Sequence, residues 1–198
     1  MNELLGLLAA GDTRLFEAIN AGMNAAFLDA AMPLVTSFRT WIPLFAIGIV
    51  WLVVRGGRSG RWCAVAMIVS VAIADPVTNR IVKPLVERQR PCRQIPHVVL
   101  RIPCPEGPSF PSSHAVNMAA VALVLTRYYR QWWLVWWSAA AVVGFSRVYV
   151  GVHYPGDVIA GWLFGAAIAS ATLWGINNSA AFVRKRRCGG GDVAPTSR

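Results

Sequence analysis

The residues best suited to chemistry lie in one short stretch, residues 146–157, with the sequence SRVYVGVHYPGD. It combines Arg147 with His153 and, four residues later, Asp157, and long apolar runs flank it on both sides. Charged side chains are costly at the edge of a membrane segment, so their presence there indicates a functional site. If a helix begins near Pro155, the carboxylate can fix the imidazole tautomer and leave the other ring nitrogen free to attack a substrate.

Two upstream stretches supply the other groups that such chemistry needs. They are KPLVERQRP, which begins at Lys83 and carries Arg90, and PSSH, which carries Ser112 and ends at His114. Together with Arg147, the two upstream cations and the backbone N–H groups of a helix start can bind a multiply charged anion, above all phosphate. His114 can act as a general acid towards a leaving oxygen. A nucleophile on one side of phosphorus and an acid on the other is the in-line arrangement of phosphoryl transfer.

The composition predicts that membrane helices position these groups. The chain has 198 residues, which suggests a single domain. It is 56% hydrophobic and only 14% charged, whereas soluble domains are about 25% charged. Several apolar blocks approach the roughly 20 residues that a bilayer requires. We therefore expect an all-α, polytopic membrane helix bundle and not a soluble helical protein.

Five transmembrane helices and an amphipathic N-terminal segment are predicted. The spans are one that begins before Arg39 and ends at Val54, then 62–82, 115–125, 132–145 and 158–176. Within residues 1–30, apolar side chains recur at helical spacing between polar ones, which is typical of a helix that lies along the membrane interface. The expected organisation is an amphipathic segment over 1–30, a membrane domain that carries all three stretches over 31–183, and a basic, Gly-rich cytoplasmic tail over 184–198.

The distribution of charge predicts the orientation. The formal net charge is +10, but the basic residues lie in short loops and form no basic stripe, which argues against nucleic acid as a partner. The turns at 55–61 and 127–130 and the tail at 184–187 are basic and fall on one side, which is cytoplasmic by the positive-inside rule. Residues 83–113 and 146–157 then face outward. The prediction is a multi-pass protein of a bacterial cytoplasmic membrane with an outward-facing site, a cytoplasmic C-terminus and an undetermined oligomeric state.

The cysteines and the remaining polar residues of the outer loop lead to further expectations. Cys92 and Cys104 lie together on the oxidising side, so we expect a disulfide that closes the loop beside Arg90. Cys63, in a span, and Cys188, in the tail, are expected to stay apart from them. The remaining cations and the histidine of this loop match no motif and are expected to be solvated; they are Arg88, Arg93, Arg101 and His97. For Arg88, contact with an anionic head group is the alternative.

The three stretches together resemble the motifs of the type-2 phosphatidic acid phosphatase superfamily. Those motifs are Lys, six residues, Arg-Pro; then Pro-Ser-Gly-His; then Ser-Arg, five residues, His, three residues, Asp. The resemblance, with its framing by helices, covers residues from about 40 to 176. It departs from the pattern at Ser113, where the family usually has Gly. Because a small Ser can still offer its backbone N–H to phosphate, we expect an altered substrate fit and not a loss of activity.

The resemblance implies a role for each motif residue. His153 would form a phosphohistidine, Asp157 would support it, and His114 would serve the leaving group. The phosphate would be held without a metal or other cofactor by a set of side chains and by the Ser113 backbone; the side chains are those of Lys83, Arg90, Ser112 and Arg147.

The function expected is hydrolysis of a lipid phosphomonoester or pyrophosphate at the outer membrane surface, with the lipid tail in the bilayer. A polyprenyl pyrophosphate or phosphatidylglycerol phosphate is favoured, and phosphatidic acid or a lipid A phosphate is the alternative. The superfamily also resembles vanadium haloperoxidases, but those are soluble and the predicted spans disfavour that activity. A non-enzymatic anionic-lipid transporter or binding protein is a further alternative, against which the complete nucleophile, orienter and acid set argues.

Overall fold

The secondary structure consists of helices. The computed structural model describes residues 2–188, and their side chains except those of residues 2, 5 and 180–188. No strand occurs in that range, which confirms the all-α prediction. The elements are α1 (Asn2–Asn20), α2 (Ala26–Thr36), α3 (Phe38–Val54), α4 (Gly57–Pro76), the π-helical η1 (Val77–Val82), α5 (Lys83–Val86), α6 (Pro91–Gln94), α7 (Ser113–Tyr128), the 3₁₀ turn η2 (Arg130–Trp132), α8 (Trp133–Tyr149) and α9 (Pro155–Cys188).

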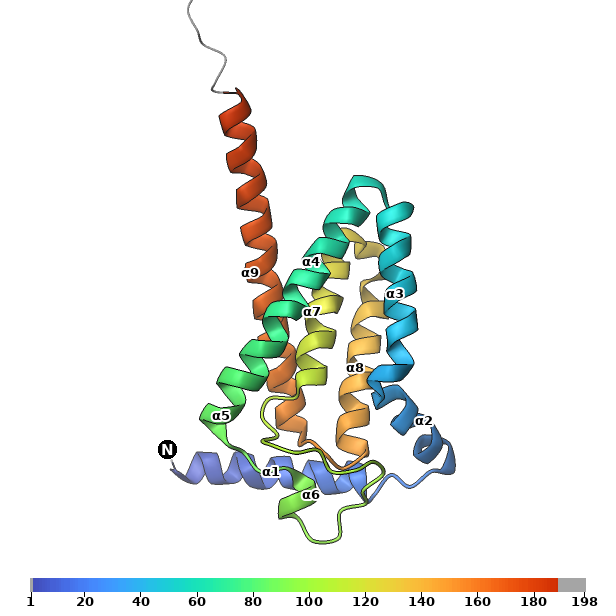
Figure 1. The fold of residues 1–198 in the computed structure, drawn as a ribbon. Helices are drawn as coiled ribbons and strands as arrows, with labels where there is room; N and C mark the ends of the chain where they lie inside the picture. Colours follow the sequence, from blue (N-terminus) through green and yellow to red (C-terminus); the bar gives the residue numbers. More distant parts are fainter. Residues whose placement is uncertain (1, 189–198) are drawn as a thin grey trace, which may run out of the picture.

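Five long helices form a bundle that one helix crosses at its end. Helices α3, α4, α7, α8 and α9 run side by side, and α1 lies across one end of them (Figure 1). Helices α2, α5 and α6 and the loop before α7 gather at the same end, which we call the α1 end. The opposite end, with the α3–α4 turn and the α7–α8 turn, we call the far end. Helix α9 projects beyond the other helices on the far-end side (Figure 1).

Some of the bundle helices are long and apolar enough to cross a bilayer. Among the described residues these are the segments Gly57–Gln94 and Pro155–Ser179, and α2 with α3 would add a third although they are bent by 58°. Helices α7 and α8 have 16 and 17 residues, hence about 24 and 26 Å at 1.5 Å per residue. A bilayer core is about 30 Å thick. Five spans are therefore not confirmed.

The second predicted span is distorted near its end at the α1 end of the bundle. Pro76 ends α4, because its ring removes a backbone donor and crowds the preceding turn. The chain continues as the wider π-helix η1 and then as α5. The run stops at Glu87, whose φ of 51° is left-handed. Lys83, the first residue of α5, is thereby carried to the α1 end on a continuous helix.

Close packing of α7 against α9 brings two motif segments together. A Cβ on Gly161 would lie 2.9 Å from the carbonyl oxygen of Ser112, and one on Gly165 would overlap the carbonyl oxygen of Val116. Glycine at these positions lets the two backbones approach as small residues do in membrane helix pairs. The start of α7, at Ser113, consequently lies beside the start of α9, at Pro155.

The expected segment boundaries differ from the helix boundaries. The boundary at residue 30 falls inside α2, which runs from Ala26 to Thr36. Asp29 on this helix accepts hydrogen bonds from Arg101 and from the Tyr149 hydroxyl. The boundary at residue 183 falls inside α9, which continues to Cys188. The remainder of the predicted tail, residues 189–198, lies outside the described residues.

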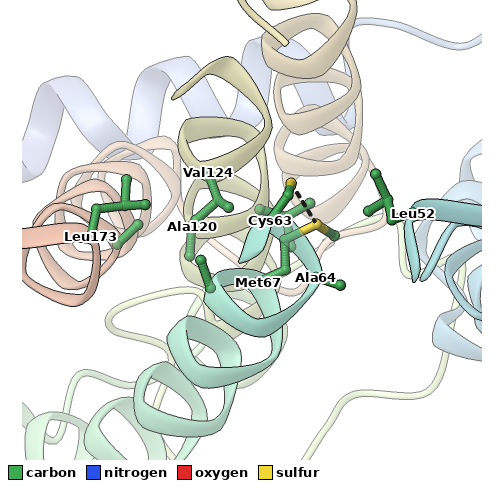
Figure 2. Close-up of a cluster of buried hydrophobic side chains, with 10 residues drawn as sticks. Leu52, Cys63, Ala64, Met67, Ala120, Val124 and Leu173 are labelled. Atoms are coloured by element: carbon green, nitrogen blue, oxygen red, sulfur yellow. Dashed lines mark hydrogen bonds between the residues drawn. The ribbon is translucent and has the colours of Figure 1, made fainter. Parts of the chain in front are cut away.

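The far half of the bundle has an apolar core. Cys63 and Met67 of α4 face α7, and their sulfur atoms lie 4.0 Å apart (Figure 2). The core also contains small and branched side chains from four helices; they are Leu52, Ala64, Ala66, Ala120, Val121, Val124, Ala169 and Leu173. This core fixes the relative position of the helices that carry the polar groups at the α1 end.

Candidate active site

Backbone and side-chain hydrogen bonds join the three predicted motif stretches at the α1 end. The N–H of Ser112 donates to the carbonyl oxygen of Asp157 (3.0 Å). The Arg90 guanidinium donates through Nη1 to the carbonyl oxygen of Val152 (3.1 Å). The first motif is therefore tied to the third, and the second to the third, although 62 residues of sequence separate Arg90 from Val152.

A tight turn after α8 presents His153. The N–H groups of Val152 and His153 both donate to the carbonyl oxygen of Arg147, at 3.2 and 3.3 Å. Gly151 has a φ of +91°, which favours glycine, and a Cβ there would lie 2.8 Å from Val98 Cγ1. The spacing between the arginine and the histidine thus corresponds to one closed turn.

His153 and Asp157 are buried and face each other. Their exposed fractions are 2% and 0%, and His153 Nδ1 lies 3.4 Å from Asp157 Oδ2. The same carboxylate oxygen accepts the backbone N–H of Tyr154 at 2.9 Å and so caps the start of α9. Asp157 therefore both caps the helix and faces the imidazole.

The second nitrogen of His153 identifies the tautomer. Nε2 lies 3.1 Å from Arg90 Nη1, and because a guanidinium has no acceptor, Nε2 must accept the hydrogen bond through its lone pair. The ring proton then sits on Nδ1, on the side of Asp157. Burial lowers the pKa of His153 to about 3, the nearby Asp157 opposes that shift, and the charges of Arg147 and Arg90 add to it. The ring is therefore neutral and has a lone pair on Nε2.

Arg147 and His114 meet at the end of α2. Arg147, 5% exposed, donates through Nη1 to the Thr36 hydroxyl (2.5 Å). His114 lies near the backbone of Thr36. Thr36 was not singled out from the sequence, because nothing in the local pattern places the end of α2 beside the third motif.

Two buried donors point to an anionic ligand. Ser112 is fully buried at the N-cap position of α7 without capping the helix through its side chain. Its Oγ and the Nε of Arg147 have no hydrogen-bond partner among the described residues. Buried polar groups are nearly always paired, so two unpaired donors on two motifs favour a ligand that accepts hydrogen bonds. The backbone N–H groups at the start of α7 add donors of the same kind.

Ser113 and Lys83 lie at the side of the site that faces α4 and η1. Ser113 Oγ donates to Asn79 Oδ1 (2.9 Å), so its side chain points to η1 while its backbone stays in the first turn of α7. Asn79 Nδ2 in turn donates to Asp75 Oδ1 (3.0 Å). Lys83 is within electrostatic range of Arg90, Arg147 and Asp157. The structure thus gathers every residue predicted for the site at one end of the bundle.

The sequence interpretation missed two residues that contact Asp157 or its helix. Arg88 was expected to be solvated, which is wrong: it donates to Asp157 Oδ1 (2.8 Å) and to Asp12 Oδ2 (2.7 Å). Asp12, on α1, was not considered at all. Arg101 was also expected to be solvated, but its side chain is 7% exposed and donates to Asp29. Arg93, on α6, and His97 are exposed as expected, and Arg93 donates to the Pro105 carbonyl.

A disulfide closes the loop that carries Arg90. Cys92 and Cys104 are bonded, with their Cα atoms 6.1 Å apart. Within the same loop, Arg90 Nε donates to the carbonyl oxygen of Gly107 (3.0 Å). Cys63 is a buried free thiol, and the side chain of Cys188 lies outside the described part. Loop closure and the Gly107 carbonyl together fix the direction in which Arg90 points.

Comparison with known proteins gives the family. No group of three His, Cys, Asp or Glu side chains in the described part of the chain could hold a metal ion. Residues 61–180 match the PAP2 superfamily, a range that includes all three motifs. The chain belongs to the PAP2 superfamily. This confirms the resemblance that the three motifs carry.

Two relatives of this chain carry phosphatase names. An undecaprenyl-diphosphatase of Sulfolobus acidocaldarius is 34% identical over 164 residues, which cover 80% of this chain and 75% of the relative. A lipid A 4'-phosphatase of Bacteroides thetaiotaomicron is 31% identical over 173 residues, 82% of this chain and 75% of the relative. The prediction that the chain is a phosphatase is confirmed at this level.

A solved PAP2 structure has the same fold. The transmembrane PAP2-type phosphatidylglycerolphosphate phosphatase of Bacillus subtilis superimposes with a TM-score of 0.68, at 22% identity, over 87% of each chain. At this identity the likeness shows a shared fold, and the long apolar helices described above indicate a membrane protein.

Proposed function

We propose that the protein is an integral membrane lipid phosphatase that hydrolyses a lipid phosphomonoester or pyrophosphate through a phosphohistidine on His153, without a metal. One observation carries the proposal. The His153 imidazole is neutral and carries its lone pair on Nε2, the ring nitrogen that points away from Asp157. It lies in a buried cluster that also holds the unpaired donors of Ser112 and Arg147. A nucleophile beside unpaired donors that suit an anion favours covalent phosphoryl transfer.

Substrate binding comes first. The phosphate oxygens accept hydrogen bonds from Arg147 Nε, from Ser112 Oγ and from the backbone N–H groups at the start of α7, including that of Ser113. Lys83 and Arg90 contribute positive charge. Arg90 Nη1, which donates to His153 Nε2 without substrate, exchanges that nitrogen for a phosphate oxygen. The exchange releases the lone pair that the reaction needs.

In the first chemical step, His153 Nε2 forms a bond to phosphorus. The bond from phosphorus to the leaving oxygen breaks, and its electron pair stays on that oxygen, which takes a proton from His114. The phosphorylated ring carries positive charge, which Asp157 stabilises through the Nδ1–H. The lipid product can then leave.

In the second step, water attacks the phosphorus. His114, now without its proton, accepts a proton from the water. The bond between phosphorus and Nε2 breaks, its electron pair returns to the imidazole, and inorganic phosphate leaves. The free enzyme is restored with no net change in its protons.

The membrane setting is proposed as follows. All five bundle helices traverse the membrane, with α2 and α3 as one bent span, and the bilayer is thinned around α7 and α8. The basic turn at 55–61 is at the far end, so the positive-inside rule puts that end in the cytoplasm and the site on the outer face. Residues 1–30 act as an interfacial segment, 31–183 as the membrane phosphatase domain and 184–198 as the cytoplasmic tail.

A polyprenyl pyrophosphate is the proposed preferred substrate, with phosphatidylglycerol phosphate next. The similarity to an undecaprenyl-diphosphatase supports the first. The similarity to a lipid A 4'-phosphatase keeps a lipid A phosphate as an alternative, and phosphatidic acid is a further one. A panel of these lipids in detergent, compared by kcat/KM, distinguishes them.

Phosphate release from that panel tests the mechanism. Wild-type protein is expected to act equally with and without a chelator. His153→Ala is expected to lose roughly 10³-fold or more in kcat, as removal of a nucleophile does in other hydrolases. Brief incubation with ³²P-labelled substrate should leave acid-labile label on wild-type protein and none on the variant. Wild-type turnover by His153→Ala would refute the mechanism.

A further inference from the structure

One face of α1 is buried against the active-site segments. Asp12, Phe16 and Asn20 follow each other at intervals of four residues and so lie on the same side of the helix. Phe16 is 1% exposed and its ring lies 5.6 Å from that of Tyr154, the residue after His153. Asn20, also 1% exposed, donates to the carbonyl oxygens of Val99 and Tyr149. An interfacial anchor would not need such a face.

Asp12 contacts the first turn of α9. Its Oδ1 accepts the backbone N–H of Gly156 (2.7 Å), one of the donors that have no partner inside a helix. A Cβ on Gly156 would lie 2.8 Å from Asp12 Oδ2, so glycine leaves room for the carboxylate at this position. Asp12 therefore holds the residue that directly precedes Asp157.

Arg88 connects the two carboxylates. Its Nη2 donates to Asp12 Oδ2 (2.7 Å), and its Nη1 donates to Asp157 Oδ1 (2.8 Å). The guanidinium carbon lies 4.0 Å from the centroid of the Tyr154 ring, within range of a cation–π contact. Asp12, Arg88 and Asp157 thus form a continuous chain of charged hydrogen bonds from α1 to the third motif.

The two oxygens of Asp157 have separate partners. Oδ2 faces His153 Nδ1 and the N–H of Tyr154, and Oδ1 is held by Arg88. A carboxylate with both oxygens engaged cannot rotate freely about its side-chain bond. The fully buried charge of Asp157 also needs a cation to offset its desolvation. Arg88 supplies both the restraint and the charge.

We propose that Asp12 and Arg88 are positioning residues of the active site, which fix the carboxylate of Asp157 and through it the ring of His153. Helix α1 then completes the site. The inference rests on the proposed function, because it concerns the orientation of the nucleophile. Neither Asp12 nor Arg88 contacts the proposed phosphate donors, Ser112 and Arg147, so kcat should fall while KM stays close to its wild-type value.

Asp12→Asn and Arg88→Lys test the proposal against Glu17→Gln, which removes the same charge from an exposed position on α1. With a short-chain lipid phosphate in detergent, both site variants are expected to lose roughly 10- to 100-fold in kcat, as when residues that orient a metal-bound histidine are changed. Glu17→Gln should match the wild type. Thermal unfolding and gel filtration in detergent report whether each variant is folded.

A double-mutant cycle separates positioning from a general structural role. If Asp12 acts through Asp157, the double variant Asp12→Asn/Asp157→Asn should be no slower than Asp157→Asn alone. Multiplied defects in the double variant, or equal changes of kcat and KM, would overturn the proposal. So would wild-type kcat in folded Asp12→Asn and Arg88→Lys. The proposed function fails separately, because only that failure leaves His153→Ala active.

Discussion

The two ends of the helix bundle hold their helices together by different means. At the α1 end, ion pairs and hydrogen bonds join segments that are far apart in the sequence, such as Asp12 with Arg88 and Arg147 with Thr36. At the far end, small apolar side chains let the helices pack closely, as Cys63, Ala64 and Ala120 do (Figure 2). Charged hydrogen bonds have one favourable geometry, whereas apolar packing tolerates several arrangements of similar volume.

The far half also leaves space between its helices. An apolar pocket of about 410 Å³ lies along α3, α4, α7 and α8, and Trp41, Met118 and Tyr129 are among its lining residues. At the α1 end, by contrast, the buried donors Ser112 Oγ and Arg147 Nε have no hydrogen-bond partner among the described residues. The comparison predicts that changes at the α1 end act on turnover and that changes at the far end act on stability.

Among the changes that test this comparison, Arg147→Lys has the largest expected effect. Lysine keeps the charge but loses the Nε donor and the planar fork, so it cannot both bond Thr36 and bind phosphate. We expect kcat/KM to fall roughly 10²- to 10³-fold, the loss typical for a donor that stabilises a transition-state anion. Initial rates of phosphate release in detergent measure it. Arg127→Lys, in the last turn of α7 at the far end, is the matched control, and equal rates for both variants would contradict the comparison.

Local spacing made the catalytic part of the site predictable. His153 and Asp157 are four residues apart, so any helix that begins between them brings the pair together, as α9 does. The three cations could be assigned to one end because helix parity and loop charge place their loops on one side. These inferences need only neighbouring residues and the number of helices.

The contribution of α1 and the span lengths could not be predicted in the same way. Asp12 meets Gly156 across 144 residues of sequence, and no periodicity encodes which loop a surface helix will cover. Helices α7 and α8 were predicted to be membrane spans because their sequences are apolar. Hydropathy does not show where a helix begins and ends, and these two have only 16 and 17 residues. Arg88 stands two residues before a motif arginine, and only the contacts show that it pairs with Asp157.

The second prediction compares one cysteine pair with one cysteine. Cys92→Ser/Cys104→Ser opens the loop that carries Arg90, and we expect the free energy of unfolding to fall by about 2–4 kcal/mol. Looser placement of Arg90 should lower kcat/KM about tenfold, equivalent to ~1.4 kcal/mol of transition-state binding. Cys63→Ala, in the far-end core, should leave kcat/KM unchanged. Thermal unfolding and initial rates test both. An unaltered kcat/KM in the double serine variant would show that the disulfide does not help to position Arg90.

The third prediction concerns stability without activity. Leu52 is 5% exposed in the far-end core, and Leu52→Ala should lower the free energy of unfolding by about 2 kcal/mol or more, because the cavity left behind is filled only in part. Below the unfolding temperature, kcat and KM should match the wild type. Leu44→Ala, an exposed residue on α3, is the control for loss of the same side chain. A large fall in kcat for Leu52→Ala would show that the two ends are coupled.

The last prediction, with the smallest expected change, is that His153 at the α1 end does not become protonated. Burial lowers the pKa of His153 to about 3, so the neutral, nucleophilic ring should persist as the pH falls through the range in which an ordinary histidine becomes charged. In ¹⁵N-histidine NMR spectra of the detergent-solubilised protein, the His153 signals should keep the Nδ1–H tautomer pattern from about pH 7.5 to about pH 5. Exposed His97 provides the comparison in the same spectra, and His153→Gln assigns the signal. Protonation of His153 near pH 6.5 would mean that the ring is solvated. The fixed, dry geometry that distinguishes the α1 end from the far end would then not hold in solution.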